Sequence, residues 1–222
     1  MTHRLLVFGD SWAYGAELDP SQREQLCFGG QLARLLNVNS VHNCAETGSS
    51  VSHLHVQFQT ALSRINYDPA DHYTAVFFIT GQQRFLAFDP DNEFYNLIPA
   101  GPSIRPVQHQ HRDLIETVND FYYRNIQSNA ADQISLNANL LALQAVCKYH
   151  GINDYYISGW QDLHLWPEVD QSRIYPNHCE SLFESNLQYI KPNVSHPNAQ
   201  GHRLIAEKLF EFIKVKSLDS TI

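Results

Sequence analysis

Residues 7–18 read VFGDSWAYGAEL, with an apolar run, a glycine, an aspartate and a serine in direct succession. The run that ends at Phe8 has the composition of a strand buried on both faces of a sheet. Parallel α/β sheets bind ligands at the carboxyl ends of their strands, and Ser11 falls at such an end. Ser11 is therefore a candidate nucleophile. The alternative is that Asp10 or Ser11 only caps a turn or helix that begins here.

The rest of the chain alternates strand and helix patterns. Short apolar runs typical of buried strands lie at residues 4–8, 41–44, 74–80 and 154–158. Between and after them, apolar residues recur at helical spacing within residues 28–36, 134–145 and 198–215. This alternation predicts a three-layer α/β/α sandwich around a mostly parallel sheet. A length of 222 residues with 43% hydrophobic content favours one domain over residues 1–222.

Two long stretches interrupt the alternation, at residues 84–107 and 159–189. The first contains several prolines, and the second carries Trp160, Trp166 and Tyr175 among polar residues. Each is too short for a core of its own. We expect loop insertions that serve as lids or walls of a binding site.

Composition and charge exclude several classes of function. The net charge is −8, and the 15 Lys and Arg residues form no basic run, so neither nucleic acid nor an anionic membrane is an expected partner. The first apolar run is too short for a signal peptide or a membrane span. The 4 cysteines form no C-x-x-C pair. We expect reduced thiols and a cytoplasmic protein, with a phage or otherwise released product as the alternative.

Polar groups suited to acyl transfer follow three other segments. NCAETGSS places Asn43 and Gly48 after the second strand, and FFITGQQRF places Gln82 and Gln83 after the third. NVSHPNAQGH places His196 just ahead of the last helix. A serine hydroxyl, a backbone donor at a loop glycine, a side-chain amide and an imidazole are the parts that acyl transfer requires.

These segments resemble the conserved blocks of the SGNH (GDSL) hydrolase family. The matches are G-D-S at residues 9–11, N-x-A-x-x-G at 43–48 and H-P-N-x-x-G-H at 196–202, so the resemblance spans nearly the whole chain. It implies a flavodoxin-like sheet and an ester hydrolase that needs no cofactor. By position, it makes Ser11 the nucleophile and first oxyanion donor, Gly48 the second donor and His196 the base.

Two positions depart from the family pattern. Gln83 stands where the family has an asparagine that supplies a third oxyanion donor; the amide is kept, but the added methylene predicts a weakened site. Asn193 stands three residues before His196, where the family has an aspartate. An amide stabilises an imidazolium less than a carboxylate does, although its oxygen can still accept a hydrogen bond from Nδ1–H.

Three mechanisms remain open at this point. The first, which we favour, is a Ser-His dyad oriented by Asn193. The second is a triad whose acid comes from elsewhere, with Asp162 and Asp170 as candidates. The third is a binding or structural protein that keeps the fold without turnover. The T-x-x-x-R pattern that ends at Arg84 resembles some family members, and we expect the pocket walls to include Asp10, Arg84 and Trp160.

Other chemistry is poorly supported by the sequence. The histidine pairs at residues 53/55 and 109/111 lack a second set of ligands at zinc spacing, so no metal is expected. No G-x-G-x-x-G or P-loop motif indicates a nucleotide. His202 is expected to be structural. The aromatic residues at 94–95 and 121–123 either pack internally or form a rim around the substrate entrance.

The sequence therefore predicts an esterase that cleaves or transfers an acyl group. The family resemblance implies a short acyl group such as acetyl and a small-molecule or carbohydrate ester as substrate.

Overall fold

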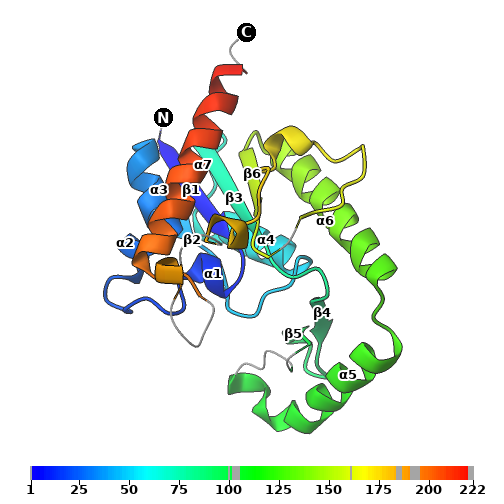
Figure 1. Cartoon of the computed structure of the whole chain (residues 1–222). Helices are drawn as coiled ribbons and strands as arrows, with labels where there is room; N and C mark the ends of the chain where they lie inside the picture. The colour runs from blue at the N-terminus through cyan, green and yellow to red at the C-terminus, as the bar shows by residue number, and fades with distance from the viewer. Residues whose placement is uncertain are drawn as a thin grey trace.

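A parallel sheet of four strands, in the order β2-β1-β3-β6, lies at the centre of the computed structural model, which describes residues 2–99, 101, 106–160, 162–183, 187–190 and 196–219 (Figure 1). Its strands are β1 (His3–Phe8), β2 (Ser40–Asn43), β3 (His72–Ile79) and β6 (Asn153–Ser158). Val7 is in register with Asn43 on one side and with Val76 on the other. The carboxyl ends of β1, β2 and β3 therefore meet at one edge of the sheet.

Helices cover both faces of this sheet. On one face, α4 (His53–Arg64) and α6 (Asn129–Tyr149) pack against Phe77, and on the other, α3 (Phe28–Leu36) and α7 (Ala199–Asp219) pack against Val76. Neighbouring residues of a strand point to opposite faces, which explains why the almost wholly buried β3 has no polar side. The predicted α/β/α sandwich is confirmed, and so are its four predicted strands.

The first insertion contains a hairpin that the sequence pattern does not predict. Strands β4 (Phe85–Phe88) and β5 (Phe94–Leu97) pair antiparallel and lead to α5 (Arg112–Asn125), which stands away from the sheet (Figure 1). Asp89 makes the turn, because its Oδ1 accepts hydrogen bonds from the N–H groups of Asp91 and Glu93 at 3.0 and 2.9 Å. The strands are only four residues long, which is too short for periodicity to identify them.

The second insertion runs beside β6 with little regular structure of its own. It contains the short 3₁₀ turns η2 (Gln171–Arg173), η3 (Glu180–Leu182) and η4 (Leu187–Tyr189). Backbone N–H groups of Tyr175 and Cys179 donate to carbonyls of Tyr156 and Ser158 in β6, each at 2.8 Å. These bonds hold the insertion along the edge of the sheet.

The cysteines agree with the expectation of reduced thiols. All 4 cysteines are free, as predicted. Burial raises the pKa of the Cys44 thiol to about 11, so this thiol stays protonated at neutral pH. No described helix combines the length and the apolar character that crossing a membrane requires.

His202 joins the two helices that cover one face of the sheet. Its side chain lies in the first turn of α7 and is buried, and Nδ1 accepts a hydrogen bond from the Phe28 N–H, at the start of α3, at 3.2 Å. Burial, with a smaller effect of the neighbouring His196, lowers the pKa of His202 to about 3. This neutral acceptor has the structural role that we expected from the sequence.

We expect His202 to make folding sensitive to acid. Below pH 6.5 the unfolded chain binds a proton at this residue, whereas the folded chain, with a pKa of about 3, does not. Stability is therefore lost as the pH falls from about 6.5 towards 3, by up to about 1.4 kcal/mol per pH unit. His202→Asn keeps an acceptor but does not titrate, so it should remove this part of the slope. Urea unfolding of both proteins at pH 7, 6 and 5 tests this, and parallel pH profiles would contradict it.

Gly9 directly follows β1, and its backbone lies close to both β3 and the first helical turn. Its φ is +148°, and a Cβ at this position would lie 2.7 Å from Phe78 Cβ and 2.8 Å from Ala13 Cβ. Both the backbone conformation and the space therefore require glycine.

We expect Gly9→Ala to destabilise the fold by about 3 to 5 kcal/mol, because it combines backbone strain with overpacking. Gly151→Ala is the matched control: its φ is +65°, but nothing lies within 4 Å of the added Cβ. That change should cost only about 1 to 2 kcal/mol. The measurement is the free energy of unfolding in urea, and equal costs at the two sites would contradict the packing argument.

Candidate active site

The turn that follows β1 presents Ser11 at the sheet edge. Asp10 has an extended backbone and caps α1 (Ser11–Tyr14), since its Oδ1 accepts a hydrogen bond from the Trp12 N–H at 3.0 Å. Gly15 ends this single helical turn in the left-handed conformation, with φ at 76°. Asp10 is therefore the capping residue, and the Ser11 hydroxyl is left to face the site.

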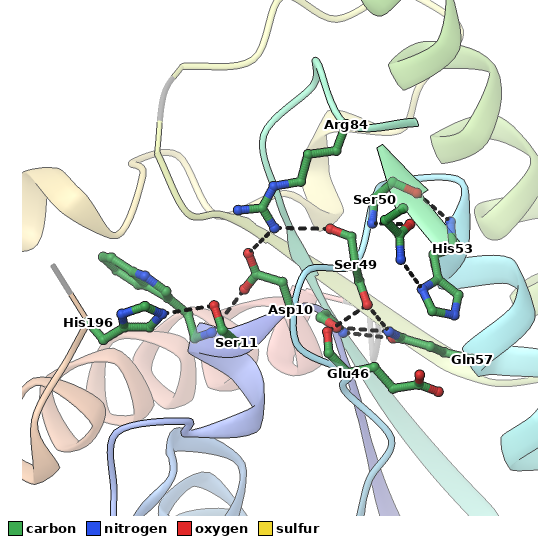
Figure 2. A network of polar contacts seen from close by, with 12 residues as sticks. Asp10, Ser11, Glu46, Ser49, Ser50, His53, Gln57, Arg84 and His196 are labelled. Atoms are coloured by element: carbon green, nitrogen blue, oxygen red, sulfur yellow. Dashed lines mark hydrogen bonds and ion pairs between the residues drawn. The ribbon is translucent and has the colours of Figure 1, made fainter. Parts of the chain in front are cut away.

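His196 reaches Ser11 from far along the chain. Its Nε2 lies 2.9 Å from Ser11 Oγ, although 185 positions separate the two residues (Figure 2). Asn198 caps the start of α7, because its Oδ1 accepts hydrogen bonds from the N–H groups of Gln200 and Gly201 at 3.0 and 3.1 Å. This cap fixes the chain from which His196 projects, and the pair has the spacing of a nucleophile and its base.

The loop that follows β2 brings Gly48 to the same edge. Asn43 Nδ2 donates to the Ala13 carbonyl in α1 at 2.9 Å, and the Glu46 N–H donates to the Gly9 carbonyl at 3.0 Å. Gly48 itself has a φ of +77°, which glycine adopts without strain. These bonds hold the loops after β1 and β2 together.

Gln57 forms hydrogen bonds with both of these loops. This residue was missed by the sequence analysis. It is almost fully buried; its Oε1 accepts from the Gly9 N–H at 2.9 Å, and its Nε2 donates to the Gly9 carbonyl and to Ser49 Oγ, both at 2.8 Å. Figure 2 shows this side chain beneath the loop that carries Ser49. The available signal is a glutamine on the apolar face of α4, beside Leu54 and Phe58.

Asp10 and Arg84, two of the three expected wall residues, form an ion pair. Arg84 Nη1 donates to Asp10 Oδ2 at 2.8 Å and to the Ser49 carbonyl at 3.1 Å. The Asp10 side chain is fully buried and that of Arg84 is 18% exposed. A buried carboxylate is costly without a partner, and Arg84 supplies one.

Trp160, the third expected wall residue, packs against Trp12, which follows Ser11 in the chain. Its ring meets that of Trp12 edge to face, with centroids 4.4 Å apart. Within the described residues, neither buried indole N–H has a hydrogen-bond acceptor.

Gln83 does not extend freely from its loop. The residue is exposed, and its backbone carbonyl accepts a hydrogen bond from the Tyr123 hydroxyl at 2.7 Å. Its side-chain amide folds back over Gly81, where an added Cβ would lie 3.2 Å from Oε1. The next residue, Arg84, therefore reaches the loops after β1 and β2 while the Gln83 amide stays with its own loop.

The candidate acids fall in different places. Asn193 lies outside the described residues. Asp162 is 83% exposed and pairs with His178 at 3.2 Å. Asp170 caps η2 through the Ser172 N–H at 3.0 Å and pairs with Arg173 at 3.1 Å. Both described carboxylates are thus engaged within the second insertion.

A polar cavity of about 700 Å³ lies between the first insertion, α6 and the second insertion. Its walls include Gln82, Gln83, Tyr123, Gln127, Asp132 and His164. Gln127 donates to Asp132 at 2.6 Å, and burial raises the pKa of this carboxyl. Of the expected aromatic rim, Tyr123 lines this cavity, whereas Tyr95 packs internally.

His53, from one of the two histidine pairs, has a structural contact. His53 is buried at the start of α4, and its Nδ1 lies 3.1 Å from Asn96 Nδ2 in β5, which ties the hairpin to the sheet. Among the described residues, no group of three or more His, Cys, Asp or Glu side chains is arranged to hold a metal ion.

Comparison with known proteins gives a fold but no close relative. No family model matches the sequence, and no curated protein matches it. Among solved structures, TesA has a TM-score of 0.55 at 14% identity, with 95% of this chain and 98% of TesA covered. The psychrotrophic esterase EstA from Pseudoalteromonas sp. has a TM-score of 0.56 at 11% identity, with 97% and 98% covered.

A third similar structure belongs to a protein assigned to the G-D-S-L lipolytic family from Desulfitobacterium hafniense. Its TM-score is 0.53 at 8% identity, with 94% of this chain and 98% of that chain covered. The chain therefore has the fold of the GDSL, or SGNH, hydrolases, as its motifs predict. At these identities the likeness concerns the fold, and activity must be argued from the site.

Proposed function

We propose that this chain is a serine ester hydrolase with Ser11 as the nucleophile and His196 as the general base. The observation that carries the proposal is the 2.9 Å contact between Ser11 Oγ and His196 Nε2. It lies at the carboxyl edge of a parallel sheet, where this architecture binds its ligands. The esterase and lipolytic neighbours that share the fold support the same class of reaction.

The reaction proceeds through an acyl-enzyme. Ser11 Oγ attacks the ester carbonyl carbon, its proton passes to His196 Nε2, and the carbonyl oxygen takes up the electron pair as an oxyanion. When the C=O bond reforms, the ester C–O bond breaks and the alcohol leaves with the proton from His196. Water then attacks the acyl-Ser11 ester with His196 as base, which releases the acid and restores Ser11.

Backbone donors stabilise the oxyanion in this proposal. The N–H groups of Ser11 and Gly48 belong to the two loops that Gln57 holds together. Donors fixed before the reaction need no reorganisation when charge develops, and this makes them effective.

Asn193 serves as the orienting residue for His196 in our proposal. Its amide oxygen accepts a hydrogen bond from Nδ1–H, which keeps Nε2 unprotonated and able to accept the Ser11 proton. The engagement of Asp162 with His178 and of Asp170 with Arg173 supports this choice over a displaced acid.

The substrate is an ester of a small, hydroxylated alcohol such as a sugar, with a short acyl group such as acetyl. The 700 Å³ cavity is not lined by Ser11 or His196, but Gln83 in its wall directly precedes Arg84, which contacts Asp10 beside Ser11. The amide and carboxyl groups of the cavity support a polar alcohol, because a lipid chain would leave these groups without partners. The family resemblance supports the short acyl group. Acceptor alcohols added to the assay separate transfer from hydrolysis.

Ser11→Ala should abolish both turnover and labelling. We expect a fluorophosphonate probe to add once to the wild-type protein, at Ser11, as seen by intact mass and peptide mapping. Turnover of nitrophenyl acetate should fall by at least about 10³-fold in Ser11→Ala, since the nucleophile is lost. Ser21→Ala, at an exposed serine, is the matched control. A folded wild-type protein without adduct or turnover would instead support a binding protein that keeps the fold.

Asn193→Asp should raise kcat for the same ester about tenfold or more. A carboxylate stabilises the imidazolium that forms during attack, and the reverse change in a serine protease triad costs about 10⁴-fold. The measurement is kcat and KM for nitrophenyl acetate. An unchanged or lower kcat would show that the acid comes from elsewhere or that Asn193 has another role.

A further inference from the structure

The guanidinium of Arg84 joins the two loops that carry the proposed oxyanion donors. Nη1 donates to the carboxylate of Asp10, which precedes Ser11, and to the carbonyl of Ser49, which follows Gly48. The arginine therefore contacts the residue before Ser11 and the residue after Gly48.

The residues that the structure describes leave the rest of this guanidinium without a hydrogen-bond partner. Arginine has five N–H donors in a rigid plane, and Nη1 uses only its own two for Asp10 and Ser49. In Figure 2 the other terminal nitrogen is turned away from these partners, on the side of the view where Ser11 and His196 lie. Because the first two contacts hold the plane in place, this nitrogen is a positioned donor.

Charge makes this donor suited to a transient anion. The buried Asp10 carboxylate balances the charge of Arg84, so the resting site carries no excess positive charge from the pair. The guanidinium can still donate a hydrogen bond to an oxyanion that forms 2.7–3.1 Å from its nitrogen, which is the distance that an oxyanion hole requires.

We propose that Arg84 supplies the side-chain donor of the oxyanion hole, in the role that the family resemblance gives to Gln83. This inference rests on the proposed ester hydrolysis. The Gln83 amide folds back over Gly81, whereas Arg84, one residue later, is fixed to both donor loops. Arg84 forms no covalent bond with the substrate; it donates a hydrogen bond to the carbonyl oxygen as that oxygen becomes negative.

The test compares an oxygen ester with its thiono analogue. Sulfur in place of the carbonyl oxygen accepts hydrogen bonds weakly, so a working oxyanion donor favours nitrophenyl acetate over nitrophenyl thionoacetate. We expect Arg84→Lys to lower kcat/KM for the oxygen ester by roughly 10²-fold and to lower the oxygen-to-sulfur ratio about tenfold. Lysine keeps a cation beside Asp10 but loses the second planar nitrogen.

Three further variants separate a catalytic from a structural role. The double variant Asp10→Asn/Arg84→Gln removes the buried charge together with the guanidinium, and it should show the same lowered ratio if it folds. Arg124→Gln changes an arginine on α5 that is 74% exposed, and it should retain the wild-type ratio. Gln83→Ala should change the ratio less than twofold.

The outcomes are distinct. A loss that affects both esters equally in Arg84→Lys, or a lowered ratio in Gln83→Ala alone, would overturn the role of Arg84 while the ester hydrolysis stands. Absence of Ser11-dependent turnover in the wild-type protein would overturn the proposed function, and the role of Arg84 with it.

Discussion

The site depends on two interactions made by the buried carboxylate of Asp10. One oxygen caps α1 through the Trp12 N–H, and the other receives Arg84. The first bond directs the chain so that Ser11 begins a helical turn with its hydroxyl toward His196. The second ties the first insertion to the end of β1. A group that is fully shielded from water thus connects a local turn to a segment 74 residues away.

The central sheet brings together the loops that the contacts of Asp10 join. Because β1, β2 and β3 are parallel and in register, the loops after them leave from a single edge. Gln57 then fixes the loops after β1 and β2 with three hydrogen bonds at buried positions, where each bond is costly to break. The rigidity of the edge therefore comes from side chains of α4 and of the first insertion, in addition to the strands themselves.

Sequence patterns predicted the strands of the central sheet, but they did not predict the hairpin or the side-chain contacts that hold the loops of the site together. Apolar runs such as residues 74–80 identify buried strands, because a strand covered on both faces has no polar side to interrupt the pattern. The motifs at residues 9–11 and 196–202 also indicated that Ser11 and His196 would meet. The hairpin of β4 and β5 was not predicted, since four-residue strands give no measurable period. Gln57 and the pair of Asp10 with Arg84 were likewise not predicted, because their partners are distant in sequence and any of several polar residues could have served.

The contact between Ser11 and His196 spans 185 positions and depends on α7 lying against α3. The chain between them supplies three of the four strands of the central sheet, so the proposed nucleophile meets the proposed base only once the sheet has formed. Until α7 packs in place, the Ser11 hydroxyl lacks its contact with His196. In our proposal, reactivity at Ser11 therefore reports completion of the fold.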